Sequence, residues 1–147
     1  MWERWNSYSH KDGFGNASMN SFNHYAYGAI GTWLYKDVAG IWYDPQLPGY
    51  KRIVFAPNPG ANMTSASATH ETPYGTARST WRTSNGVMEW TVQIPSNSEG
   101  YLLFPTKKAA SIRIDGDKLP NGMLGESECG TPCVILPSGT YQILLKL

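Results

Sequence analysis

Charge and long hydrophobic runs are both scarce in this sequence, and each shortage excludes a class of protein. Only 16% of the 147 residues are Asp, Glu, Lys or Arg, and the formal net charge is +1. This balance gives no electrostatic argument for binding nucleic acid or an anionic membrane surface, and we expect neither partner. No run approaches the roughly 20 apolar residues of a membrane-spanning helix, and the N-terminus lacks the basic and apolar regions of a signal peptide.

Cysteine is scarce too, with Cys129 and Cys133 close together in the segment ECGTPC. They are either two free thiols in a turn or a local disulfide, which would close too small a loop to stabilise the chain much. A zinc site is disfavoured because no second ligand pair stands at a suitable spacing. We therefore expect no metal and no cofactor.

Aromatic residues are abundant by contrast, with 6 Trp, 9 Tyr and 4 Phe, and 15 Gly and 10 Pro accompany them. The Gly and Pro content favours many short strands and turns. The chain divides into a helical part, residues 1–42, and an all-β part, residues 43–147. In the first part a helix is expected to start at Ser18 or Asn20 and end at Gly40. Its apolar residues recur near the helical period, at Phe22, Ala26, Ile30, Trp33, Leu34 and Val38.

The second part predicts about eight short strands and an antiparallel β-sandwich. Asn85-Gly86 is typical of a type I′ turn, so the segments on either side are expected to form a hairpin. In the strand after this turn the side chains alternate, and the apolar set is expected to face a core. That set is Met88, Trp90, Val92 and Ile94.

A carboxylate, Glu3, stands between Trp2 and Trp5 at the start of the sequence. Rings can cover the apolar face of a pyranose while a carboxylate performs acid–base chemistry on it, so these residues are candidates for a sugar site. The alternative is an exposed, functionless glutamate. Glycoside hydrolysis usually needs two carboxyl groups, and no residue stands out as the partner of Glu3.

Further candidates lie on or near the expected helix. His24 is either a contact to a sugar hydroxyl or a buried, satisfied histidine, and Asn20 and Asn23 are either polar site contacts or helix caps. Tyr25 and Tyr27 are either platforms for a sugar or core residues.

These residues carry a resemblance to a known family. The sequence resembles the C-terminal part of bacterial α-L-rhamnosidases, glycoside hydrolase family 78, over about residues 1–95. The most specific segments are MWERW at 1–5 and MNSFNHYAYGAIG at 19–31, and weaker ones follow in the family's order, PGYKRI at 48–53, PNPG at 57–60 and PYG at 73–75.

The resemblance implies an inverting enzyme with an (α/α)6 barrel followed by a C-terminal β-sandwich. Residues 1–42 would be the helical remnant of the catalytic barrel, and 43–147 the sandwich domain. Glu3 would be the general base that activates water, with His24, Trp2, Trp5 and Asn23 binding the rhamnose. The general acid would lie far upstream in the barrel, so we expect the 147-residue chain to be inactive alone.

The partner expected from the resemblance is a rhamnose-containing glycoside, bound through the full-length enzyme. The helix, cut off from its barrel neighbours, is expected to dock on the sandwich or pair with a second copy. The location, bacterial cytoplasm or secreted, would depend on a missing N-terminal region. The alternative function is a stand-alone carbohydrate-binding or structural β-sandwich module, with Trp81, Trp90 or the helix aromatics as its rings.

Overall fold

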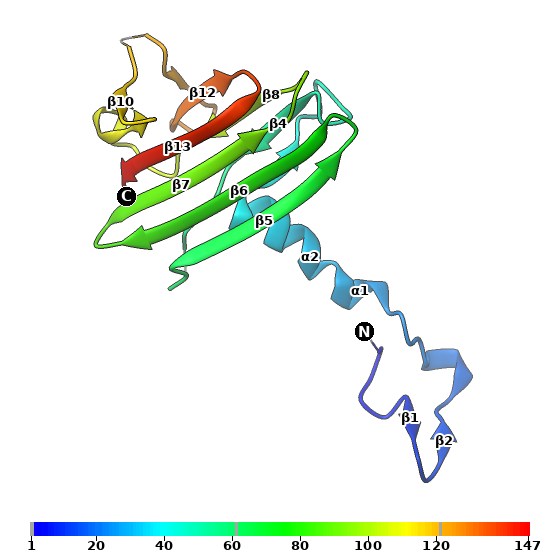
Figure 1. Cartoon of the computed structure of the whole chain (residues 1–147). Helices are drawn as coiled ribbons and strands as arrows, with labels where there is room; N and C mark the ends of the chain where they lie inside the picture. Colours follow the sequence, from blue (N-terminus) through cyan, green and yellow to red (C-terminus); the bar gives the residue numbers. More distant parts are fainter. Residues whose placement is uncertain (1, 61, 121) are drawn as a thin grey trace. The chain divides into compact units, whose positions relative to one another are not determined.

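A computed structural model describes residues 2–60, 62–120 and 122–147, and the chain forms two compact units, Met1–Trp33 and Leu34–Leu147. In Figure 1 the colours follow the sequence, from blue at the N-terminus to red at the C-terminus. The expected boundary between residues 42 and 43 falls inside a strand, β3 (Ile41–Tyr43), so residues 41 and 42 belong to a sheet. Assigning residues 1–42 to a catalytic domain stays a prediction.

The first unit is a small hairpin followed by short helical turns. Strands β1 (Tyr8–Ser9) and β2 (Gly13–Phe14) pair antiparallel. A 3-10 helix, η1 (Ala17–Met19), follows, and the side chain of Asn16 caps it by accepting from the Ser18 N–H at 3.0 Å. The helices α1 (Tyr25–Gly28) and α2 (Ile30–Trp33) complete the unit.

The expected helix start at Ser18 or Asn20 is wrong, because the regular helix begins only at Tyr25. Asn20 has φ −145° and ψ 55°, and its side chain bonds to the backbone of the hairpin instead of capping a helix. The backbone N–H of Ser21 donates a hydrogen bond to the carboxylate of Glu3. These contacts between segments distant in sequence override the local helical periodicity.

The second unit begins with a π-helix, η2 (Leu34–Ala39), which ends at Gly40 as expected. Gly40 has φ +75°, and a Cβ there would overlap the backbone of Ala56 and Pro57. The carbonyls at the end of a helix lack partners within it. Here the side chains of a neighbouring strand supply them: Trp81 Nε1 donates to Val38 O at 2.8 Å, and Ser79 Oγ donates to Ala39 O at 2.6 Å.

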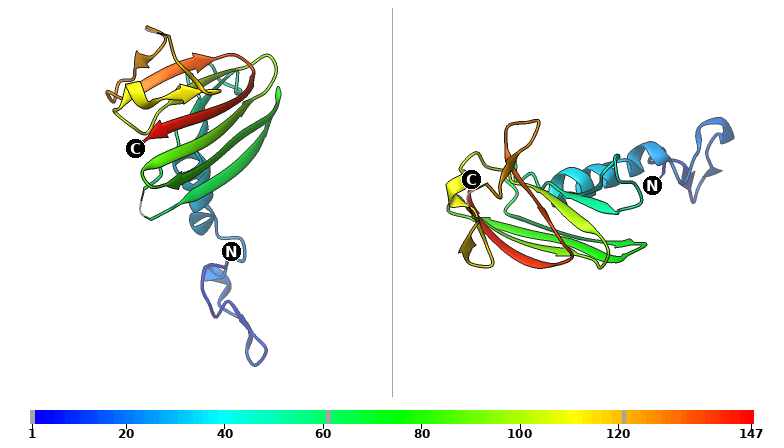
Figure 2. Two further views of the ribbon diagram at one scale, coloured as in Figure 1. Left: turned by 60° about the vertical axis from the view of Figure 1, so that its left-hand side comes forward. Right: turned by 90° about the horizontal axis from the view of Figure 1, so that it is seen from above.

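Two sheets form the body of the second unit, and the predicted β-sandwich is confirmed (Figure 2). The six-stranded sheet has the order β10 (Asp117–Lys118), β9 (Arg113–Ile114), β13 (Gly139–Lys146), β7 (Val87–Ile94), β6 (Gly75–Ser84), β5 (Ser65–Thr72). The five-stranded sheet has the order β11 (Gly125–Glu126), β12 (Pro132–Leu136), β8 (Glu99–Leu103), β4 (Arg52–Phe55), β3. A short 3-10 helix, η3 (Ala109–Ser111), precedes β9. The pairing of β4 with β8 is parallel and was not expected.

The predicted hairpin and its alternation are both confirmed. Asn85 and Gly86 have φ values of 51° and 71°, as a type I′ turn requires, and β6 pairs antiparallel with β7 across them. On β7 the expected apolar set is buried, from Met88 at 0% exposure to Ile94 at 3%. The core between the sheets also holds Ile53, Phe55, Trp81, Leu102, Phe104 and Leu145, each at most 1% exposed.

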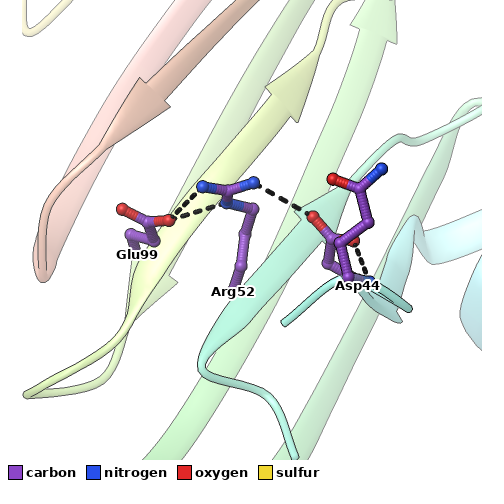
Figure 3. Close-up of polar contacts among 4 residues, drawn as sticks. Asp44, Arg52 and Glu99 are labelled. Carbon is purple, nitrogen blue, oxygen red and sulfur yellow. Dashed lines mark hydrogen bonds and ion pairs between the residues drawn. The ribbon is translucent and has the colours of Figure 1, made fainter. Parts of the chain in front are cut away.

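An ion triad ties the β3–β4 connection to β8 (Figure 3). Arg52 Nη2 lies 2.6 Å from Glu99 Oε1, and its Nη1 lies 3.3 Å from Asp44 Oδ2. Asp44 also accepts the Gln46 N–H at 2.8 Å. The hydrogen bond to Glu99 raises the pKa of Arg52, which therefore stays charged. The triad fastens the ends of the two parallel strands.

Both cysteines are free thiols, Cys129 exposed and Cys133 buried on β12. The pKa of Tyr101 on β8 is raised to about 12. The largest cause is a side-chain hydrogen bond with Cys133, and burial of the phenol is the second. Of the two open alternatives for these cysteines, the structure therefore has the thiols.

Candidate active site

Ser21 holds Glu3 at two points in the first unit. The Glu3 N–H donates to Ser21 O at 2.7 Å, and the Ser21 N–H donates to Glu3 Oε2 at 2.9 Å. The Glu3 side chain is 21% exposed, so it is sheltered without being sealed from water. A hydrogen bond to an ionised carboxylate is stronger than one between neutral groups, and it fixes the direction of the carboxylate.

The structure brings His24 to the other carboxylate oxygen. His24 Nε2 lies 3.8 Å from Glu3 Oε1, and the His24 side chain is 34% exposed. His24 occupies the position before α1 and its side chain does not cap that helix. The imidazole is therefore directed at the carboxylate and not at the helix end.

The two tryptophans beside Glu3 in the sequence have different surroundings. The Trp2 ring lies edge-on to Phe22 with centroids 5.1 Å apart, and edge-to-face or tilted contacts continue through Phe14 to Tyr8. Trp2 is 45% exposed, whereas Trp5 is fully exposed. The Trp2 ring is thus held in place by Phe22 while about half of the residue stays accessible to solvent. No ring contact to Trp5 is present among the residues of the first unit that the structure describes.

Asn23 is exposed, and so is Tyr25 at 84%. Tyr25 is therefore not a core residue of the first unit. Tyr27, the second tyrosine proposed as platform or core, has a side chain that lies outside the described part of the chain, as does Met1.

Reasoning from the sequence missed two parts of the site. Ser21, which holds the Glu3 carboxylate through its backbone, drew no attention because any residue can supply a backbone N–H. Asn20 was considered only as a sugar contact or a cap, yet its side-chain amide donates to Ser7 O at 3.0 Å and to Gly15 O at 3.5 Å. The one available signal was an asparagine in a segment of poor helix formers, which favours side-chain bonds to backbone.

Two of the rings suggested for a separate carbohydrate-binding module, Trp81 and Trp90, do not form a platform on the sandwich. Trp81 and Trp90 are each 1% exposed, and their indole N–H groups donate to Val38 O and Ser79 Oγ. Both tryptophans belong to the core, as the alternation predicted for Trp90. Using them to hold a sugar is thereby excluded.

Residues 2–60, 62–120 and 122–147 contain neither a cluster of metal-ligand side chains nor a membrane-spanning helix. No group of three or more His, Cys, Asp or Glu side chains gathers as metal ligands would. No helix in those ranges has the length and apolarity needed to span a membrane.

Two protein-domain families match the chain, in successive segments. Residues 1–38 match the bacterial alpha-L-rhamnosidase 6 hairpin glycosidase domain, and residues 40–118 match the bacterial alpha-L-rhamnosidase C-terminal domain. Ala39, the last residue of the π-helix, lies between the two matches.

Known proteins that are similar to this chain in sequence or in structure are named alpha-L-rhamnosidases. An alpha-L-rhamnosidase of Formosa agariphila is 42% identical over 99% of this chain. The crystal structure of the Streptomyces avermitilis alpha-L-rhamnosidase complexed with L-rhamnose matches 99% of this chain and 14% of its own, with a TM-score of 0.78 and 34% identity. The alpha-L-rhamnosidase of Dictyoglumus thermophilum matches all of this chain and 16% of its own, with a TM-score of 0.79 and 26% identity. The chain spans 16% of the length of the Formosa relative.

Proposed function

We propose that this chain, which belongs to the bacterial alpha-L-rhamnosidase family, is the C-terminal part of an enzyme that hydrolyses terminal α-L-rhamnose from glycosides with inversion. The observation that carries the proposal is the pairing of Glu3 with His24, 3.8 Å apart, within the segment that matches the glycosidase domain. Residues 43–147 are assigned to the sandwich domain that follows the catalytic barrel, and residues 1–42 to the end of that barrel.

Glu3 serves as the general base in this proposal. Oε2 is held by the Ser21 N–H, so Oε1 is the oxygen that takes a proton from water. The oxygen of that water attacks the anomeric carbon from the face opposite the leaving group, and the glycosidic bond breaks. His24, beside Oε1, is placed to contact a sugar hydroxyl, and the half-exposed Trp2 ring is placed to cover an apolar sugar face. Trp5 and Asn23, both exposed, are assigned to the same sugar.

The general acid that protonates the leaving oxygen is assigned to a part of the longer enzyme. Inverting enzymes hold their two carboxyl groups about 6.5–9.5 Å apart to leave room for water. The first unit contains one other carboxylate, Asp12, which is exposed and accepts a hydrogen bond from Ser9 in the hairpin turn. The sequence and its surroundings single out no second carboxyl, so we expect the isolated chain to be inactive.

A chimera tests the role of Glu3. The matching C-terminal segment of the Streptomyces avermitilis enzyme is replaced by this chain, and hydrolysis of 4-nitrophenyl α-L-rhamnopyranoside is measured. We expect turnover in the chimera and a loss of about 100-fold or more in kcat with Glu3→Gln, the size of effect typical of a missing general base. Glu89→Gln is the matched control, because Glu89 is exposed on β7 in the second unit.

Two outcomes would contradict the proposal. One is a folded chimera, verified by circular dichroism, that does not hydrolyse the rhamnoside. The other is a Glu3→Gln chimera as active as the Glu89→Gln control. Hydrolysis by the isolated chain that depends on Glu3 would place the general acid within these residues and overturn the assigned division of roles.

A further inference from the structure

Asn20 connects three segments of the first unit through its side chain. Its amide donates to Ser7 O at 3.0 Å and to Gly15 O at 3.5 Å, while the Gly15 N–H also donates to Ser7 O at 2.8 Å. Ser7 is fully buried, so these bonds form where water competes little. The two ends of the β1–β2 hairpin are thereby fastened to residue 20.

The residue after Asn20 is the one that holds the candidate base. Ser21 exchanges two hydrogen bonds with Glu3, one through each of its backbone polar groups. The peptide between Asn20 and Ser21 is planar, so the position of Asn20 limits the direction of the Ser21 N–H. The connection from the buried Ser7 backbone to the Glu3 carboxylate therefore passes through one peptide unit.

We propose that Asn20 is a positioning residue, which holds the Ser21 N–H on Glu3 Oε2 and so leaves Oε1 as the oxygen that accepts the proton. The choice of Oε1 as proton acceptor rests on the proposed function, whereas the hold on Ser21 does not. A general base must lie within about 2.6–3.2 Å of the proton-bearing oxygen, and a displacement of about 1 Å can cost about 100-fold in rate.

The chain offers variants that separate the parts of this arrangement. Asn20→Ala removes the side-chain donors, and Asn20→Asp keeps the shape but sets a carboxylate against the carbonyls of Ser7 and Gly15. Asn6→Ala and Asn6→Asp are matched controls, because Asn6 is an exposed asparagine of the same unit. Glu3→Gln replaces the carboxyl group by an amide of similar size.

Nuclear magnetic resonance of the whole labelled chain tests the proposal without needing activity. The Ser21 amide proton resonance is followed against pH. We expect a pH-dependent step in the wild type, none in Glu3→Gln, and a step reduced to less than half in Asn20→Ala and Asn20→Asp, with both Asn6 variants unchanged. A residue with only a structural role would leave the pH response of Ser21 unaltered.

A measurement on the unmodified chain guards against variants that do not fold. The side-chain NH2 protons of Asn20 are expected to exchange with water at least about ten-fold more slowly than those of Asn6. Equal exchange would overturn the proposal, and so would a Ser21 step of wild-type size in folded Asn20→Ala. Neither result bears on Glu3 as the base, which falls only if the Glu3→Gln chimera keeps its turnover.

Discussion

Removing one hydroxyl from the sandwich core should release the end of the π-helix. Ser79 is fully buried, and its Oγ donates to Ala39 O at 2.6 Å while accepting the Trp90 indole N–H at 3.0 Å. Ser79→Ala leaves a donor and an acceptor unpaired in the core. Each such group costs about 1–3 kcal/mol, so we expect a loss of about 3 kcal/mol in the free energy of unfolding. For a unit of this size that lowers Tm by roughly 10 °C.

Urea unfolding followed by tryptophan fluorescence measures this loss, since Trp81 and Trp90 are both buried. The matched control is Ser67→Ala on β5, where the exposed hydroxyl bonds only to Thr80 in the part of the chain described. Surface changes of this kind usually stay within about 0.5 kcal/mol. The Trp90 indole N–H resonance should also shift in Ser79→Ala alone. Equal stability of the two variants would refute the reasoning that these bonds hold the helix end.

Two further changes test the backbone and the β8–β12 contact. Gly40→Ala should cost about 3 kcal/mol or more in unfolding free energy, because it adds a left-handed penalty to a collision with Pro57. Gly86→Ala, at a similar φ of +71° in open space, should cost only about 1 kcal/mol, and equal losses would exclude the collision. The raised pKa of Tyr101 favours the protonated phenol in the fold, so its contribution to stability is complete below the ordinary pKa of 10.0 and is lost as pH rises toward about 12. Cys133→Ala should lower that pKa in a tyrosinate absorbance titration, and an unchanged titration would contradict the assigned cause.

Much of the sandwich could be predicted because its signals are local. The Asn85-Gly86 turn needs only two residues that tolerate positive φ, and the alternation on β7 needs only period two. The parallel pairing of β4 with β8 could not be predicted, because it joins strands more than forty positions apart and depends on the rest of the sheet. The ion triad beside this strand pair, in which Arg52 contacts Glu99 and Asp44, could not be predicted either, because it depends on the same pairing.

The candidate site was predicted only in part. Glu3 and His24 were selected from residue type and from family resemblance, and the structure places them 3.8 Å apart. The bonds that orient Glu3 were missed, because a backbone N–H such as that of Ser21 carries no sequence signature. The helix was expected to start too early for the same reason, since periodicity cannot show that Asn20 bonds to Ser7.

Three elements follow from rules that act within a few residues: the type I′ hairpin, the inward face of β7 and the end of the helix at Gly40. Which polar groups contact one another depends on how distant segments pack in the folded chain. Ser79 and Trp81 donate hydrogen bonds to the carbonyls at the end of the helix. The Ser21 N–H donates one to the carboxylate of Glu3. The physical reason is that backbone preferences act within a few residues, whereas a buried donor or acceptor must be satisfied by whatever group the folded chain brings to it.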